Sequence, residues 1–192
     1  MKYSTFYKNS FGMLKHAERE LRKIFEEYKW KNSKEIVYHT SRIKSPDSMI
    51  EKLENKGYPV NEESALHLVH DVLGARIVCV FREDVFRVVR YMKSHFAFTV
   101  VKEKDYISDP KESGYRSYHL ICRYDNKDGR YFYFEIQIRD MTNDVWAVIE
   151  HRINYKKNER YKGVIEDELK KCASSLATID IMLSAIRKTG KE

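Results

Sequence analysis

The segment from Tyr131 to Arg139 alternates apolar and polar residues, and no other feature restricts the fold of this chain as strongly. Its even positions are all phenylalanine or isoleucine, whereas its last three odd positions are Glu135, Gln137 and Arg139. Because side chains on a strand alternate between its two faces, this pattern predicts a strand with one buried and one polar face. The chain is therefore expected to fold around a sheet that carries charge on one side.

Three more strands are predicted around this one. Residues 116–124 form a strand directly before it, and the Asp-Gly sequence in the loop 125–130 predicts an antiparallel hairpin between the two. Residues 75–81 and 97–104 are also predicted to be strands. A cation-rich loop then connects residue 104 to the hairpin.

Apolar periodicity and capping signals predict the helices. Residues 11–30 carry an apolar stripe with steps of three and four, and Ser45 and Pro46 supply the N-cap and first turn of a helix that ends at Gly57. The other predicted helices are 62–70, 83–94, 141–154 and 163–188. Strands separated by helices, followed by a hairpin, predict a mixed α/β fold with one mixed sheet of about five strands, in a single domain over residues 1–192.

The last predicted helix has apolar residues at alternating steps of four and three, which is a heptad pattern. Its members are Ile165, Leu169, Cys172, Leu176, Ile179, Leu183 and Ile186. Such a seam either packs on the protein's own sheet or forms an interface with another chain, and its length favours neither. Because Cys79 and Cys122 also fall in apolar patterns, three buried thiols are expected.

Composition narrows the class of partner. The net charge of +7 favours polyanionic ligands, nucleotides or RNA, although a lysine-rich surface gives the same sum. No apolar run approaches the ~20 residues that span a bilayer, and the N-terminus has no apolar signal region. We therefore expect a cytoplasmic protein without a membrane partner.

Three predicted strands place polar side chains on a common face. Arg76, His119, Glu135 and Gln137 would meet in one cavity if these strands are neighbours. A solvated sheet face is the ordinary explanation for one such strand. Agreement among three strands, beside a cation-rich loop, favours a polar cavity instead.

Two carboxylates and a set of cations complete this candidate site. Asp71 and Glu135 are suited to a Mg²⁺–nucleotide complex, which uses one or two carboxylates together with phosphate oxygens. Tyr115, which follows Gly114, is a candidate platform for base stacking. The candidate phosphate ligands are Arg42, Lys44, Lys104, Lys111, Arg116 and Arg139. A P-loop or Rossmann site is disfavoured, because neither glycine motif is present.

Several ordered segments together resemble the synthetase domain of RelA/SpoT-type alarmone enzymes, most closely the single-domain small alarmone synthetases. The matching segments are Ser41–Pro46, Asp71–Arg76, Lys104–Ile107, Pro110–Lys111, Ser113–His119, Glu135–Arg139, Trp146–His151 and Tyr155–Lys156. The resemblance covers residues 38–157 and leaves helical extensions at 1–37 and 158–192. It implies a nucleotidyltransferase-like fold.

The resemblance also implies a reaction, the transfer of the β,γ-pyrophosphate of ATP to the ribose 3′-hydroxyl of GDP or GTP with Mg²⁺. Arg42 and Arg76 would sandwich the adenine, and Lys44 would hold the ATP phosphates. Asp71 would bind Mg²⁺. Glu135 would bind Mg²⁺ or take the proton from the 3′-hydroxyl.

On the acceptor side, the resemblance implies that Tyr115 stacks on guanine. The residues implied to bind phosphates or to position the nucleotides are Lys104, Lys111, Arg116, His119, Gln137 and Arg139. Two positions depart from the family pattern, Ser41 where glycine is frequent and Asp140 where threonine is frequent. Relatives of this size usually form homotetramers through terminal helices, so a homo-oligomer is expected.

Two alternatives remain open at the level of sequence. A toxin-type relative would pyrophosphorylate the 3′ end of tRNA or make adenosine alarmones, and its candidate partners are tRNA and an antitoxin, which the sequence does not decide. The basic residues Lys156, Lys157, Arg160 and Lys162 suit an RNA. The other alternative is a catalytically inactive module that binds nucleotide or RNA, which the presence of Asp71 and Glu135 disfavours.

Overall fold

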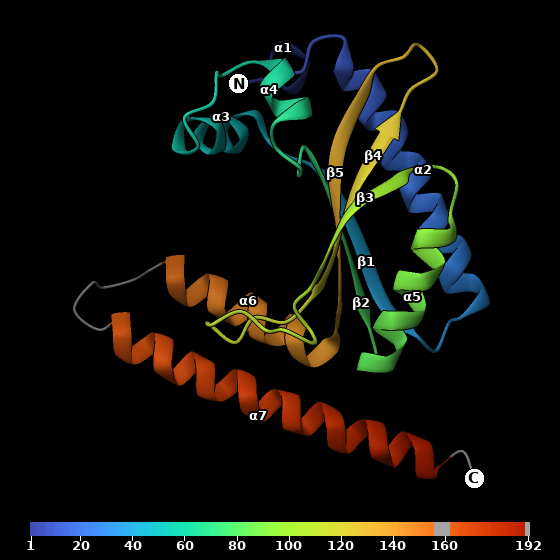
Figure 1. The fold of residues 1–192 in the computed structure, drawn as a ribbon, viewed down its shortest axis with the longest axis vertical. Coiled ribbons are helices and arrows are strands. Elements are labelled where there is room, and N and C mark those ends of the chain that lie inside the picture. The colour runs from blue at the N-terminus through green and yellow to red at the C-terminus, as the bar shows by residue number, and fades with distance from the viewer. Residues whose placement is uncertain (156–161, 191–192) are drawn as a thin grey trace.

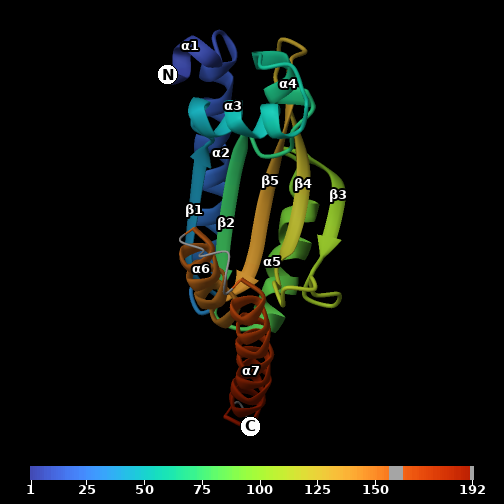
Figure 2. The ribbon, with the colours of Figure 1, turned by 90° about the vertical axis from the view of Figure 1, so that its left-hand side faces the viewer.

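A single five-stranded sheet forms the centre of the computed structural model, which describes residues 1–155 and 162–190. Its strands are β1 (Ile36–Ile43), β2 (Leu73–Cys79), β3 (Thr99–Asp105), β4 (Tyr118–Asp125) and β5 (Tyr131–Asp140). Their order is β1-β2-β5-β4-β3, and β2 and β5 are the parallel pair (Figure 2). The mixed sheet predicted from the sequence is confirmed.

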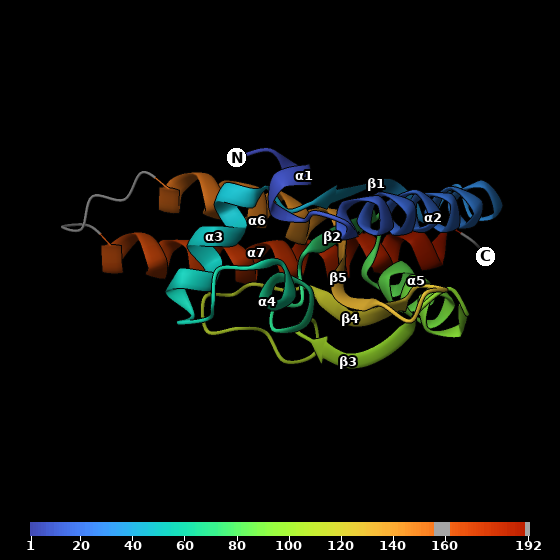
Figure 3. The same ribbon diagram turned by 90° about the horizontal axis from the view of Figure 1, so that it is seen from above.

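The helices cover the two faces of the sheet unequally. The helices are α1 (Tyr3–Phe6), α2 (Ser10–Lys31), α3 (Pro46–Asn55), α4 (Glu62–His67), α5 (Arg82–Ser94), α6 (Met141–Tyr155) and α7 (Lys162–Thr189). Figure 1 shows α2 and α5 against one face, whereas α3 and α4 lie at one end of the other face and α6 and α7 at its opposite end. Seen from above, β1 and β3 form the two edges (Figure 3). The middle of the second face is thus left without a covering helix.

The hydrophobic core lies between the sheet and the pair α2 and α5. The four even positions of β5 that were predicted to be buried are at most 2 % exposed, and they are Phe132, Phe134, Ile136 and Ile138. Helix α2 contributes Leu14 and Phe25 to this core, and α5 contributes Val88 and Met92, all fully buried. Burying a side chain of this size contributes about 1.5–3 kcal/mol to stability, so burial of the apolar residues determines which face of each strand points toward the helices. The polar face follows from it.

Strand register aligns the polar positions. Arg76 of β2 is paired with Gln137 of β5, which is paired in turn with His119 of β4. Two residues earlier on the same two strands, Gly74 is paired with Glu135. These pairings confirm that the three strands are neighbours and that their polar residues share a face.

Most predicted element boundaries agree with the structure within two residues, with three exceptions. The four-residue helix α1 was not predicted. β1 was not predicted, because as an edge strand it buries mainly its first and last residues and shows no clean alternation. Helix α4 ends at His67 rather than at residue 70. The chain turns there because Val69 and Val72 are buried on either side of Asp71, which leads into β2.

Helix α7 buries only part of its predicted apolar seam. Leu169 is 8 % exposed, but Ile179 and Ile186 are 45 % and 67 % exposed, and Cys172 is exposed although it was predicted to be buried. In its second half the helix turns Asp180 and Ser184 inward instead, at 4 % and 7 % exposure.

No helix in residues 1–155 and 162–190 has the length and apolar character that crossing a bilayer requires.

Candidate active site

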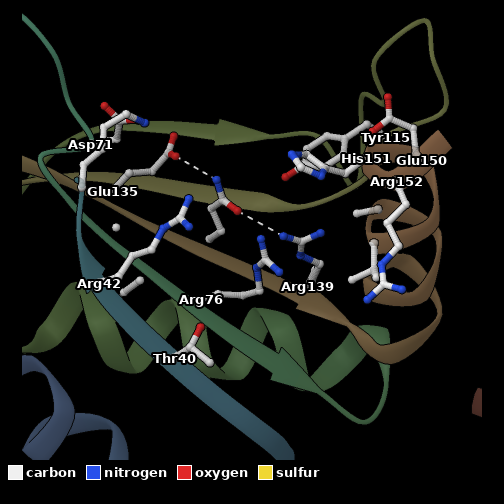
Figure 4. A pocket seen from close by; sticks show the side chains of 16 residues that line it. Thr40, Arg42, Asp71, Arg76, Tyr115, Glu135, Arg139, Glu150, His151 and Arg152 are labelled. Carbon is white, nitrogen blue, oxygen red and sulfur yellow. Dashed lines mark hydrogen bonds and ion pairs between the residues drawn. The ribbon is translucent and has the colours of Figure 1, made fainter. Parts of the chain in front are cut away.

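A cavity of about 550 Å³ opens on the polar face of the sheet, between the end that carries α3 and α4 and the end that carries α6 (Figure 4). Its size is that of a small-molecule site. The predicted site residues that line it are Arg42, Lys44, Asp71, Arg76, Tyr115, Glu135, Gln137 and Arg139. These residues come from the loops before α3 and β2, from strands β1, β2 and β5, and from the loop before β4.

Asp71 marks one end of the cavity. Its Oδ2 atom lies 2.9 Å from Nζ of Lys44 and 2.7 Å from Nζ of Lys52. Burial raises the pKa of Asp71, but the hydrogen bonds from Lys52 and Lys44 outweigh this effect and the net pKa is lowered. The other carboxylate oxygen, Oδ1, is buried and has no hydrogen-bond partner. Asp71 is therefore ionised, with one oxygen directed to nothing in the protein.

Glu135 lies beside Asp71 in the same end of the cavity (Figure 4). Its Oε1 atom accepts a hydrogen bond from Nδ1 of His119 and its Oε2 atom accepts one from the amide of Gln137, each at 2.9 Å. Burial alone would raise its pKa, but His119, Gln137 and the charge of Lys104 lower the pKa to about 2. Glu135 is thus held as a carboxylate in a fixed orientation.

A branched chain of hydrogen bonds connects Glu135 to Tyr115 and to Arg139. On one side, Nε2 of His119 lies 2.9 Å from the hydroxyl of Tyr115. On the other side, Arg139 donates to the Oε1 atom of Gln137 at 3.1 Å. The guanidinium of Arg139 also lies over the ring of Tyr115, 5.8 Å from its centroid. The five side chains therefore orient one another, and displacing one of them disturbs the rest.

At the far end, two arginines share one carboxylate that was not predicted. Nη1 of Arg76 and Nε of Arg139 each lie 3.6 Å from Oδ1 of Asp144, and Tyr38 donates a hydrogen bond to its other oxygen. Burial lowers the pKa of the Arg139 guanidinium, which is 1 % exposed. Nε and Nη1 of Arg139 and Nε of Arg76 are buried without a hydrogen-bond partner. Such donors are costly to bury, so this end is built for an acceptor that the protein itself lacks.

The remaining predicted phosphate ligands differ in position. Lys104 is paired with His119 across β3 and β4, and its charge acts on Glu135. Nζ of Lys111 lies over the ring of Tyr115, 5.2 Å from its centroid. Arg116 instead donates to the carbonyl of Gly114 at 3.1 Å, beside α7. His119 is 7 % exposed and lies behind Glu135.

The two carboxylates suit a divalent cation. Asp71 offers an oxygen without a hydrogen-bond partner, and each oxygen of Glu135 retains a lone pair beside the hydrogen bond that it accepts from His119 or Gln137. No group of three or more His, Cys, Asp or Glu within residues 1–155 and 162–190 is arranged to hold a metal by itself. An ion at this position would need further oxygen ligands, as Mg²⁺ obtains from nucleotide phosphates and water.

Several cavity residues were missed by reasoning from the sequence. Lys52 does not line the cavity but pairs with Asp71 there. It lies at a half-buried position of α3 with no distinctive neighbours in the sequence, so no signal pointed to it. Asp144, His151 and Arg152 all come from α6, and His151 and Arg152 line the cavity. The segment Trp146–His151 belonged to the family resemblance but was given no role. Residues 156–161, which include the basic residues Lys156, Lys157 and Arg160, lie outside the described residues.

Known proteins provide an independent comparison. A family model described as "Region found in RelA / SpoT proteins" matches residues 41–160. The GTP pyrophosphokinase YwaC of Bacillus subtilis is 39 % identical over 169 residues, which cover 86 % of this chain and 80 % of YwaC. The residues matched by the family model include Asp71 and Glu135.

Solved structures agree with this result. The crystal structure of small alarmone synthetase 2 from Bacillus subtilis has a TM-score of 0.82 at 34 % identity and covers 95 % of this chain and 98 % of its own. Small alarmone synthetase 1 of the same organism, bound to its product pppGpp, has a TM-score of 0.83 at 31 % identity, with 99 % and 98 % covered. With a family model over most of its length and relatives matched almost from end to end, this chain belongs to the RelA/SpoT family and is an enzyme of its GTP pyrophosphokinase class.

Proposed function

We propose that this enzyme transfers the β,γ-pyrophosphate of ATP to the ribose 3′-hydroxyl of GDP or GTP, with Mg²⁺, and so makes ppGpp or pppGpp. The observation that carries the proposal is the placement of Asp71 and Glu135 in one cavity, beside lysines and between arginines. Pyrophosphoryl transfer needs alignment of donor and acceptor together with neutralisation of negative charge. The cavity supplies cations at both ends and, beside Asp71, a second carboxylate that is held in a fixed orientation.

The donor would occupy the side formed by β1 and β2. Arg42 and Arg76 line the cavity from neighbouring strands, and their guanidiniums can stack on a base without losing charge. Lys44 and Lys52 are assigned to the triphosphate, because its negative charge can replace that of Asp71 as their partner. Asp71 would then be released to hold Mg²⁺.

The acceptor would occupy the side formed by β5 and the loop before β4. Tyr115 is assigned to the guanine, and Lys104 and Lys111 to the acceptor phosphates. Arg139 lies between this ring and Asp144, and its unpartnered N–H groups suit a nucleotide oxygen. Arg116 is assigned to support of the loop, because its hydrogen bonds go to main-chain carbonyls.

Glu135 is placed to accept the proton of the 3′-hydroxyl as that oxygen attacks the β-phosphorus, with AMP leaving. A carboxylate whose pKa is about 2 is a weak base, so this proton transfer requires a hydroxyl that is more acidic than usual. Bound Mg²⁺ would supply that acidity by lowering the pKa of the 3′-hydroxyl. His119 holds Glu135 in the orientation for this transfer through its Nδ1–H group. Gln137 fixes the second oxygen, so that one lone pair remains directed into the cavity.

The proposal is tested by incubating the protein and Mg²⁺ with ATP labelled at the γ-phosphate and one acceptor at a time, namely GDP, GTP, ATP or tRNA, and separating the products. The expected result is label in ppGpp or pppGpp and release of AMP, without any requirement for RNA. Label that enters only tRNA would support the toxin-type alternative. Absence of transfer to every acceptor would contradict the proposed reaction.

Self-association through the terminal helices is part of the same proposal. Exposed apolar residues gather on α6 at Val145 and Ile149 and on α7 at Met182 and Ile186, each at least 47 % exposed. Their burial against other copies would account for this surface. Light scattering should show an oligomer, expected to be a tetramer, and Met182→Glu with Ile186→Glu should shift it toward monomers. A wild-type monomer at all concentrations would contradict this assignment.

A further inference from the structure

The loop that carries Tyr115 rests directly on α7. Gly114 has φ +90°, and a Cβ atom built there would lie 2.6 Å from the Cβ of Ala173 and 3.7 Å from the Cα of Lys170. Figure 1 shows this loop beside α6 and α7, below the sheet. Only glycine on the loop and a small residue on the helix allow such an approach. The loop backbone therefore takes its position from the surface of α7.

Arg116 fastens this contact. Its Nη1 atom donates to the carbonyl of Gly114 at 3.1 Å and lies 3.5 Å from the carbonyl oxygen of Ala173. Burial lowers the pKa of the Arg116 guanidinium, in keeping with a group enclosed between the loop and the helix. The same side chain thus connects one main-chain carbonyl on each side of the contact.

Tyr115 follows Gly114 and packs into the same junction. It contacts a small cluster of Trp146, Leu169 and Ala173, which are 3 %, 8 % and 1 % exposed. The indole of Trp146 donates to the carbonyl of Leu169 at 2.8 Å and joins α6 to α7 at this point. The Tyr115 hydroxyl is held by His119 from β4. Its ring is therefore supported by α6 and α7 on one side and by the sheet on the other.

Helix α7 is anchored firmly enough to act as a support. At its far end, Nη1 of Arg187 lies 2.8 Å from each carboxylate oxygen of Asp84, which is fully buried. Ser184 donates to Glu83 at 3.0 Å, so the anchor lies on the first turn of α5. A charge pair of this kind is costly to break. A side chain inserted between α7 and the loop would therefore displace the loop rather than the helix.

We propose that Ala173 is a positioning residue for the acceptor nucleotide: it sets the place of the Gly114–Tyr115 segment, and through it that of the base-stacking ring. This inference rests on the proposed function, in which Tyr115 binds guanine. Ala173 is not among the residues that line the cavity. Enlarging Ala173 should weaken acceptor binding and leave ATP binding unchanged.

The test compares Ala173→Leu with Ala185→Leu, which makes the same change at an exposed position of the same helix. Overpacking at a tight contact costs about 1–3 kcal/mol, so KM for GDP should rise about tenfold or more in Ala173→Leu, with KM for ATP nearly unchanged. Ala185→Leu should resemble wild type in both constants. Ala173→Ser, the smallest enlargement, should retain most acceptor affinity.

GDP affinity is also measured without turnover. The chain has two tryptophans, and Trp30 is 88 % exposed, so Trp30→Phe leaves Trp146 as a reporter at the junction. In this background, Trp146 fluorescence should report weaker GDP binding in Ala173→Leu. If leucine prevents folding, Ala173→Val applies a smaller displacement and is read in the same way.

The outcomes separate the two claims. A wild-type protein without transfer to GDP or GTP would contradict the proposed function, whereas the fluorescence titration would still test the role of Ala173. An unchanged GDP affinity in Ala173→Leu, or an equal loss of ATP affinity, would overturn the positioning role. An equal effect of Ala185→Leu would do so as well.

Discussion

The two ends of the cavity satisfy their charges in opposite ways. At one end, Asp71 accepts hydrogen bonds from Lys44 and Lys52, so an anion lies between two cations. At the other end, the guanidinium of Arg76 and the buried guanidinium of Arg139 share Asp144, at distances too long for hydrogen bonds. Three of their N–H groups have no partner.

This difference separates charges that support the fold from charges that await a ligand. The lysines around Asp71 stabilise the free protein and must exchange partners when a nucleotide binds. The arginines around Asp144 are costly in the free protein and regain hydrogen bonds only with a ligand. Substitutions at the two ends should therefore have opposite effects on stability while both reduce activity.

The largest effect is expected at Glu135, which lies beside Asp71 and is hydrogen-bonded through Gln137 to Arg139. Glu135→Gln keeps the size of the side chain but removes the charge and the proton acceptor, so kcat should fall by about 10²–10⁴-fold. Binding of ATP, measured by calorimetry, should change much less. Unchanged product formation in this variant would show that Glu135 takes no part in the reaction.

Next in size is Arg139→Met, which sharpens the comparison. Removing a buried, poorly paired guanidinium should leave stability unchanged or raise it by about 1 kcal/mol or more, while activity falls at least about tenfold. Thermal unfolding and turnover measured on the same sample check this. Arg123→Met removes an exposed arginine paired with Asp125 and is the matched control. A marked loss of stability in Arg139→Met, with none in the control, would show that the guanidinium already supports the fold.

Asp71→Asn should have the opposite effect on stability. Because the folded pKa of Asp71 is lowered, its charge stabilises the fold above the pKa of an unfolded aspartate, about 3.9, and this contribution is lost as pH falls through the folded pKa. Asp71→Asn should cost about 1–3 kcal/mol at pH 7 and progressively less below about pH 4. The measurement is denaturant unfolding of the variant and the wild type at pH 7 and below about pH 4. Asp128→Asn, at an exposed ion pair, should change little. A pH-independent difference at Asp71 would contradict this account.

The smallest effect is expected for Asp144→Asn. The amide keeps the hydrogen bond from Tyr38 in one orientation but no longer attracts the two arginines, so their positions should loosen. KM for ATP should rise about fivefold to tenfold, because one partly satisfied contact is worth about 1 kcal/mol. Steady-state kinetics with ATP varied check this. An unchanged KM would show that Arg76 and Arg139 are oriented without Asp144.

The sequence was sufficient to predict those parts of the molecule that are determined by a local pattern of residues. The alternation in β5 located Glu135, Gln137 and Arg139 on one face, since burial of the phenylalanines and isoleucines fixes the opposite face. It did not reveal β1, because an edge strand with partial burial has no such alternation. Lys52 was missed for a related reason. Its role depends on where α3 lies relative to Asp71, which no spacing within the chain encodes.

Helix α7 shows the same limit. Its apolar seam is regular, but the residues that dock its second half are Asp180, Ser184 and Arg187, which meet polar groups of α5. Polar docking depends on particular partners rather than on a periodic pattern. For this reason the exposure of Cys172 and the contact of Ala173 with Gly114 became visible only in three dimensions.

The central claim is that Asp71 and Glu135 hold one ion between a donor and an acceptor in a single cavity. A crystal structure with Mg²⁺, a non-hydrolysable ATP analogue and GDP tests it most directly. The account predicts one ion within about 2.0–2.1 Å of both carboxylates, with adenine between Arg42 and Arg76 and guanine on Tyr115. Nucleotides bound outside the cavity, or an ion that contacts neither carboxylate, would contradict it.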